Sequence, residues 1–293
     1  MWWIRTFQLA VALTTMAGEL PAQSTRSTDD TAVASFATAV REATARYQDQ
    51  ATAIGDGYRR IGPDFPSMGE HWVSIPLVVS GTIDPEHPPI LEYATLRGRP
   101  TLVGVAYTQL LSAGSPAALV PASPDDWHYH AGTVDEESFI LGHAGTDHEH
   151  PESGGPRIAV LHAWVWADNP AGFFATDNWA LPYLRLGLPV PLMVGPTPAS
   201  FALALAAGGE AYFRTLLQLR HHPSPEQARA IQDLLARQAA AIREEVASGR
   251  PPEAEELTRL WVRLERSIRE SCPSCGDGSQ PLFGPLPEIP PAN

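Results

Sequence analysis

Between residues 72 and 191, short runs of β-branched and aromatic residues alternate with Pro, Gly and Asp. This alternation is typical of β-strands separated by turns. Parallel strands need a long crossover between them, and no helical stretch separates these runs, so the pattern predicts an antiparallel sheet. We expect a loop at 58–66 and a hairpin that turns at Gly98. The expected strands are 73–79, 90–95, 102–109 and 158–166.

Helical spacing of apolar residues marks both sides of this β-rich part. One helix is expected within 28–57, and three more within 196–272. The first of these three is alanine-rich and weakened at Gly208 and Gly209, and the second starts at the capping box Ser224-Pro-Glu-Gln227. We predict an α+β fold in which 58–195 forms an antiparallel sheet or partly open β-barrel. An N-terminal helix and a C-terminal three-helix segment flank it, and the Pro- and Gly-rich tail at 273–293 is expected to be flexible.

The N-terminus has the residue order of a secretory signal peptide. Arg5 precedes an apolar run from Phe7 to Met16, and small and polar residues follow. The run is too short to cross a bilayer. We therefore expect residues 1–23 to be removed, with cleavage after Ala17 or Ala22, leaving a secreted or periplasmic protein without a transmembrane anchor.

Charge and composition exclude several functions. The formal net charge is -13, and an acidic chain repels phosphate backbones, so we expect no nucleic-acid partner. All 20 basic residues are arginines. The absence of lysine excludes Schiff-base chemistry, a P-loop lysine and a Ser-Lys dyad.

Histidines are concentrated between Trp127 and Trp166, which contain six of the ten in the chain. His128 and His130 are two residues apart, so on a strand they share a face. Such a pair commonly supplies two imidazole ligands to a metal, with a distant residue completing the shell. His162, on an apolar and aromatic strand face, is the best third ligand. The alternative is that His162 is a hydrogen-bonded core residue and the pair faces solvent.

Two further residues are candidates for this site. His71, beside Trp72 and just before the first expected strand, is a possible fourth ligand, although a histidine beside a tryptophan is more often a packing residue. Glu136 is a possible ligand or general base, or a solvated acid beside Asp135 and Glu137. The loop with His143, His148 and His150 is rich in Gly, Asp and Pro, which is typical of a surface loop that binds metal only adventitiously.

The order His128-x-His130, Glu136, His162 weakly resembles cupins, which are small β-barrels with a three-histidine, one-glutamate metal site. The resemblance covers only 127–169. Cupins leave three or four residues between the second histidine and the glutamate, whereas residues 131–135 intervene here.

Other side chains are candidates for substrate contacts or for a disulfide. Trp127, Asn169, Asn178 and Trp179 are possible pocket residues, and Phe173 and Phe174 are expected in the core. Cys272 and Cys275 form a CxxC without the context of a thioredoxin-like site, so a local disulfide is expected in an oxidising compartment.

Three segments resemble an uncharacterised family of exported bacterial proteins: Met68-Gly-x-His71, Pro88-x-x-Leu-x-Tyr93, and His162-x-Trp followed by Asn169-Pro-x-Gly-x-Phe-Ala175. The similarity spans about 58–191. The resemblance implies export but no particular activity, and it strengthens the case for His71 and His162 because both lie within the shared segments.

Together, these features predict an exported protein with a mononuclear histidine-based metal site, and one interpretation of this site is a metal-dependent enzyme that acts on a small molecule. Imidazole-rich shells suit zinc or copper, and iron or manganese becomes plausible if Glu136 joins. One alternative is a non-enzymatic module that binds a small molecule. Another is a structural envelope protein that docks through its helices. The substrate and the oligomeric state stay open.

Overall fold

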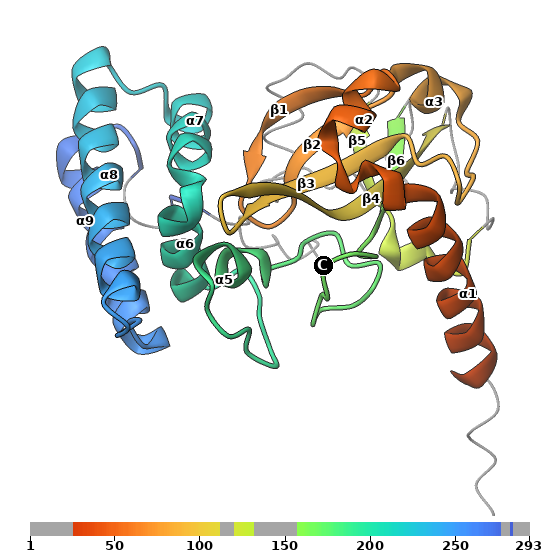
Figure 1. Ribbon diagram of the computed structural model, residues 1–293. Coiled ribbons are helices and arrows are strands. Elements are labelled where there is room, and N and C mark those ends of the chain that lie inside the picture. Colours follow the sequence, from red (N-terminus) through yellow and green to blue (C-terminus); the bar gives the residue numbers. More distant parts are fainter. Residues whose placement is uncertain (1–25, 112–119, 132–156, 277–281, 284–293) are drawn as a thin grey trace, which may run out of the picture.

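The computed structural model describes residues 26–111, 120–131, 157–276 and 282–283 (Figure 1). Within these residues, six strands form one curled, half-barrel sheet in the order β1-β2-β3-β4-β6-β5. Every neighbouring pair is antiparallel. The predicted α+β class and antiparallel sheet are therefore confirmed. The strands are β1 (Arg59–Phe65), β2 (Gly69–Val73), β3 (Ile90–Leu96), β4 (Arg99–Leu111), β5 (His128–Ala131) and β6 (Arg157–Ala163).

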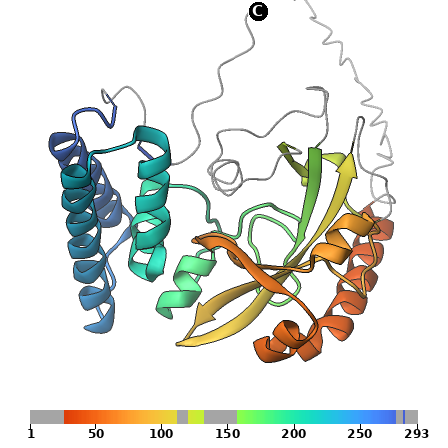
Figure 2. The ribbon, with the colours of Figure 1, turned by 90° about the horizontal axis from the view of Figure 1, so that it is seen from above.

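Helices lie on two sides of the sheet (Figures 1 and 2). On one side, α1 (Arg26–Thr44), η1 (Ala45–Gln48) and α2 (Gln50–Gly55) form the N-terminal helical region. On the other side lies the C-terminal helical segment. It comprises α6 (Pro198–Ala204), η3 (Leu205–Gly209), α7 (Glu210–His221), α8 (Pro225–Ala247) and α9 (Ala254–Ser271). Three short helices lie in the connections: α3 (Ile75–Ser80), η2 (Pro124–Asp126) and α5 (Leu181–Leu186).

The two faces of the sheet pack against different partners. One face presents Leu91, Tyr93 and Leu161 to an apolar cluster that includes Phe36 and Val40 of α1. On the opposite face, two apolar clusters lie at different positions along the strands. The first contains Ile90 and Val160, and the second contains Ala94 and Trp164 together with the core of the C-terminal helices. The side chains between these two clusters form the candidate site.

The prediction of a strand at 73–79 is wrong for most of these residues. The strand ends at Val73, and residues 75–80 form α3 instead. Pro76 lies in the first turn of this helix, where its missing N–H is tolerated, whereas in a strand it would interrupt the hydrogen-bond ladder. Gly81 ends the helix in the left-handed region, with φ of 63°.

The expected loop at 58–66 is instead the edge strand β1. Its pairing with β2 shifts register between Ile61 and Asp64, so Gly62 and Pro63 lie in an irregularity. A proline is accepted there because edge strands and bulges leave one N–H position unpaired. Strand β6 is also shorter than expected. It ends at Ala163, because the backbone N–H of Trp164 donates to the carbonyl of Phe173 at 3.0 Å rather than to a strand.

The helical predictions are largely confirmed. The N-terminal helix is interrupted at Asp49, whose side chain accepts a hydrogen bond from Ala51 N and caps α2. The capping box at the start of α8 is present, with Ser224 and Gln227 bonded to each other's backbone N–H. The weak point at Gly208 is a kink with φ of 106°, where the chain passes through η3 between α6 and α7.

The predicted cysteine pair, Cys272 and Cys275, is joined by a disulfide directly after α9. Within the expected flexible tail, Leu282 and Phe283 are buried, and Phe283 packs against Trp261 of α9 and Phe213 of α7. None of the helices in the described part of the chain is both long and apolar enough to cross a membrane. The expected signal peptide lies outside the described residues.

Candidate metal centre

Strand register brings His71, Glu92 and His162 to one face of the sheet. His71 of β2 is directly opposite Glu92 of β3, and Glu92 is directly opposite Gly104 of β4. Two residues further along β4, Ala106 is directly opposite His162 of β6. Directly paired residues of antiparallel strands point to the same side, as do residues two apart on one strand. The three side chains therefore converge from three strands.

The three side chains form a compact donor set. One ligand atom from each of His71, Glu92 and His162 lies within 4.8 Å of the others, so the group could hold a metal ion. Glu92 Oε1 is the central atom, because it is hydrogen-bonded to Nδ1 of His162 and lies 3.8 Å from Nε2 of His71. The rings of His71 and His162 are nearly perpendicular, with centroids 6.1 Å apart.

This donor set is buried. The relative exposures of His71, Glu92 and His162 are 1%, 0% and 0%. Aromatic rings pack against it: Phe65 contacts His71 edge-on at 5.3 Å, and Trp164 lies nearly parallel to His162 at 6.1 Å. Among the described residues, the second carboxylate oxygen of Glu92 and Nε2 of His162 have no hydrogen-bond partner. Buried polar atoms without partners are costly, and a cation is one way to compensate them.

A β-bulge in β4 makes room for the carboxylate. The pairing of β3 with β4 shifts between Glu92 and Tyr93, which leaves Val103 as an extra residue on β4. The next residue, Gly104, lies against Glu92, and a Cβ there would overlap Glu92 Oε2 and lie 3.1 Å from the ring of Trp164. The glycine is therefore needed for space rather than for turn geometry.

Burial, and to a smaller extent the nearby imidazoles of His162 and His130, together lower the pKa of His71 to about 3. His71 is therefore neutral at physiological pH, which is the protonation state that a metal requires of imidazole.

His128 and His130 share one face of β5, as their spacing predicted, and the pairing of β5 with β6 places them next to this group. On β6, their direct partners are Val160 and Ile158, which are two and four residues from His162. The two imidazoles are buried, with their Nε2 atoms 3.1 Å apart. The ring of His128 stacks on that of His162 at a centroid distance of 5.0 Å. The four predicted histidines thus form one cluster, in which the compact donor set contains His71 and His162.

The other predicted site residues lie elsewhere. Glu136 and the loop with His143, His148 and His150 are outside the described residues. Trp127 is buried in the apolar cluster under α1, on the opposite face of the sheet. Asn178 donates to the carbonyl of Asp168 at 3.2 Å, and Asn169 donates to the carbonyl of Asp177 at 2.9 Å. Trp179 packs on Phe201 at 5.2 Å. Phe173 and Phe174 contact Phe36 of α1.

Glu92 is the functional candidate that the sequence analysis did not include. It lies in the run Ile90-Leu-Glu-Tyr-Ala94, where a single charged residue interrupts a stretch that is buried on both faces of the sheet. A carboxylate in such a position needs a partner, and this signal was available in the sequence. Thr108 lies on the same face opposite Val160, and its buried hydroxyl has no hydrogen-bond partner among the described residues.

Comparison with known proteins gives no further assignment. A scan of protein-family models and searches of the curated proteins and of the solved structures found no match to this chain.

Proposed function

We propose that this chain is an exported metal-binding protein whose mononuclear centre is formed by His71, Glu92 and His162. The observation that carries the proposal is the convergence of three donor atoms, from three strands, within 4.8 Å in a fully buried layer. Removing a carboxylate from water is unfavourable unless a cation compensates its charge. A divalent ion provides that charge.

The donor set restricts the choice of ion. Two imidazoles with one carboxylate form zinc sites in hydrolytic enzymes and iron(II) sites in oxygenases. The sequence predicted a ligand shell made of imidazoles, and such a shell suits zinc or copper. A carboxylate at the centre of the group adds iron(II) beside zinc as the ion best suited to the site.

Three protein ligands leave a coordination position open, which distinguishes catalytic metal sites from closed structural ones. His71, Glu92 and His162 would hold the ion, which would supply Lewis-acid chemistry: polarisation of a substrate oxygen or a lowered pKa of bound water. We therefore extend the proposal to a metal-dependent enzyme that acts on a small molecule. Export is supported by the charged, apolar and small-residue order of residues 1–23 and by the disulfide after α9.

The structural envelope alternative receives no support from the helical segment. Docking through these helices predicts a wide exposed apolar stripe. Within the described residues of α6 to α9, Val262 is the one large apolar side chain that is exposed.

Metal analysis tests the proposal directly. The purified chain is stripped with a chelator, incubated separately with Zn²⁺, Fe²⁺ under anaerobic conditions, Cu²⁺ and Mn²⁺, and freed of excess metal before quantification. We expect about one equivalent of zinc or iron in the wild type, and at least roughly 100-fold weaker binding in Glu92→Gln, because the substitution removes the charged donor. The double variant H128Q/H130Q should weaken binding by only about tenfold, as expected for groups next to the ligands.

Glu70→Gln is the matched control, because Glu70 neighbours His71 and pairs with Arg60 at the protein surface. It removes the same charge and should bind metal like the wild type. Two results would contradict the proposal: less than about a tenth of an equivalent of any of these metals in the wild type, or unchanged affinity in Glu92→Gln. Either would mean that His162 and Glu92 form a buried structural pair.

Gly104→Ala should weaken metal binding although every donor atom remains. The new methyl group overlaps the Glu92 carboxylate, so the carboxylate has to leave its present position beside the imidazoles. We expect at least a tenfold loss of metal affinity and a decrease of about 1–3 kcal/mol in the free energy of unfolding, as is usual for overpacked sites. Titration with a fluorescent metal competitor measures the first effect. Gly55→Ala, where a Cβ meets nothing within 4 Å, is the control and should retain full affinity.

A further inference from the structure

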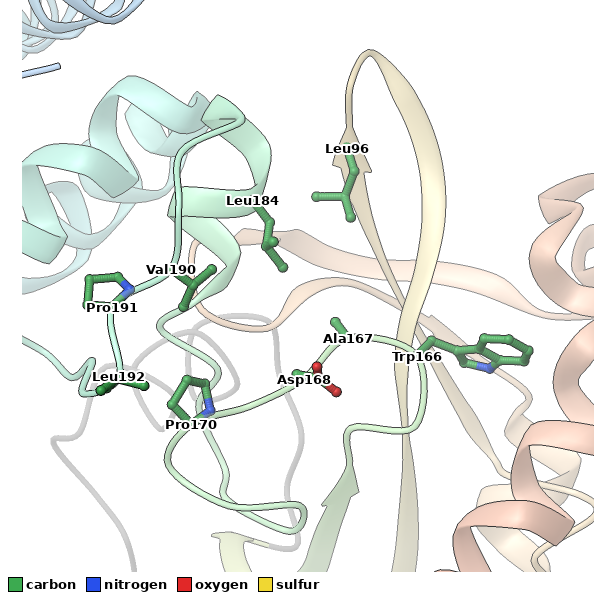
Figure 3. A pocket seen from close by; sticks show the side chains of 9 residues that line it. All are labelled: Leu96, Trp166, Ala167, Asp168, Pro170, Leu184, Val190, Pro191 and Leu192. Carbon is green, nitrogen blue, oxygen red and sulfur yellow. The ribbon is translucent and has the colours of Figure 1, made fainter. Parts of the chain in front are cut away.

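A second site is separate from the metal centre. A pocket of about 610 Å³ lies between the tip of the β3–β4 hairpin, the chain that follows β6, and α5 with the loop after it (Figure 3). Its volume is in the range of sites that bind small molecules. Leu96, Leu184 and Val190 approach it from these different segments, and every lining residue except Asp168 is apolar.

Hydrogen bonds hold the backbone of residues 166–168 in place, and the Asp168 side chain takes no part in them. The Val103 carbonyl, in the β4 bulge, accepts hydrogen bonds from the N–H groups of Trp166 and Ala167 at 3.1 Å and 2.9 Å. Asn178 binds the carbonyl of Asp168. Among the described residues, the Asp168 carboxylate has no ion-pair partner. A pocket whose backbone is already ordered loses less entropy when a ligand binds.

Large apolar side chains at the rim are exposed to water. Leu192, which lines the pocket, is 95% exposed, and its neighbour Met193 is 90% exposed. Such exposure of adjacent large apolar residues is unfavourable, and an apolar ligand in the pocket would cover part of it. Two arginines directly follow lining residues in the sequence, and neither lines the pocket: Arg97 lies in the hairpin turn after Leu96, and Arg185, after Leu184, is paired with Asp64.

We propose that this pocket binds an amphiphilic amine, with its apolar body between Leu96, Leu184 and Val190 and its ammonium group at Asp168. The apolar walls select a hydrocarbon body, and the carboxylate selects a cationic over an anionic head group. The net charge of -13 also disfavours anionic ligands.

Calorimetric titration of the full chain with n-octylamine, n-octanol and octanoate, each below its micelle concentration at pH 7, tests this inference. We expect saturable binding of one octylamine, with octanoate at least tenfold weaker. Shortening the amine to hexylamine should weaken binding by roughly tenfold, because each buried methylene contributes about threefold to fourfold. Asp168→Asn should weaken octylamine binding by about threefold to fivefold and leave octanol binding unchanged, as expected for a partly exposed ion pair.

Asp233→Asn is the matched control, because Asp233 is an exposed residue of α8 and the substitution changes the net charge equally. It should bind octylamine like the wild type. The inference is overturned by absence of saturable octylamine binding at millimolar concentration, by equal affinity for octanoate, by equal affinity for hexylamine, or by equal behaviour of Asp168→Asn and Asp233→Asn. None of these outcomes affects the metal-binding proposal, which concerns different side chains.

Discussion

Replacing Gly69 with alanine is expected to lower the free energy of unfolding by about 3–5 kcal/mol, which is large for a single methyl group. Gly69 begins β2 with φ of 88°, a conformation that costs L-residues about 1–2 kcal/mol. In addition, a Cβ there would overlap the Tyr93 carbonyl oxygen and lie 2.9 Å from its carbonyl carbon. Backbone atoms of a central strand cannot rotate away, so β2 itself has to move.

Displacement of β2 should also reach the candidate metal centre, because His71 follows Gly69 by two residues and is paired with Glu92. Gly81→Ala is the control that separates the effect of the steric overlap at Gly69 from the effect of the positive φ. Gly81 also has positive φ, of 63°, but a Cβ at this position meets nothing within 4 Å. We expect Gly81→Ala to cost about 1–2 kcal/mol and to keep wild-type metal affinity. Denaturant unfolding and metal titration of both variants provide the comparison, and equal losses in the two would show that the collision has no effect.

Acidifying the metal-free protein from pH 7 to pH 5 is expected to lower the free energy of unfolding by about 2 kcal/mol through His71 alone. Its pKa is about 3 in the folded protein and about 6.5 in an unfolded chain. Between these values the unfolded state binds the proton and the folded state does not, so stability rises with pH. The stabilisation is fully present above about pH 6.5 and is lost progressively as the pH falls toward 3, by about 5 kcal/mol in total.

Denaturant unfolding of chelator-treated protein between pH 7 and pH 4.5 measures this dependence. His71→Gln removes the titrating group, so its stability should depend less steeply on pH than that of the wild type. The comparison also separates His71 from His221, whose pKa is lowered by burial and by neighbouring Arg220. Parallel pH curves for wild type and His71→Gln would contradict the assigned role of His71.

The sequence predicted those features that depend on local pattern. The period of apolar residues identified the main helices, and the Ser224 capping box located the start of α8. The hairpin at Gly98 followed from two β-rich runs around a turn residue. Local signals were misleading where tertiary context decides. Residues 59–65 contain Gly62 and Pro63, which indicate a loop, yet the segment pairs with β2 as an edge strand.

The candidate site shows the same limit. The two-residue spacing of His128 and His130 correctly predicted that they share one face of their strand, whereas their position beside His162 depends on the pairing of β5 with β6. The spacing cannot reveal that His71 lies opposite Glu92, because that pairing depends on the register between β2 and β3. The bulge at Val103 then aligns Glu92 with Gly104. Glu92 was missed for this reason, although its position in an apolar strand marked it as a residue in need of a partner.

The distribution of the donors over three strands has a kinetic consequence. Glu92 and His162 are 70 residues apart in the chain, and closing this loop reduces the conformational entropy of the chain. The free energy that compensates this loss comes from the pairing of the strands rather than from binding of an ion. An ion would therefore enter after the strands have assembled. Because the donors are almost completely shielded from water, entry and departure of an ion require a transient opening of the side chains and segments that cover them. Exchange with free metal should accordingly be slow and accelerate with temperature or mild denaturant.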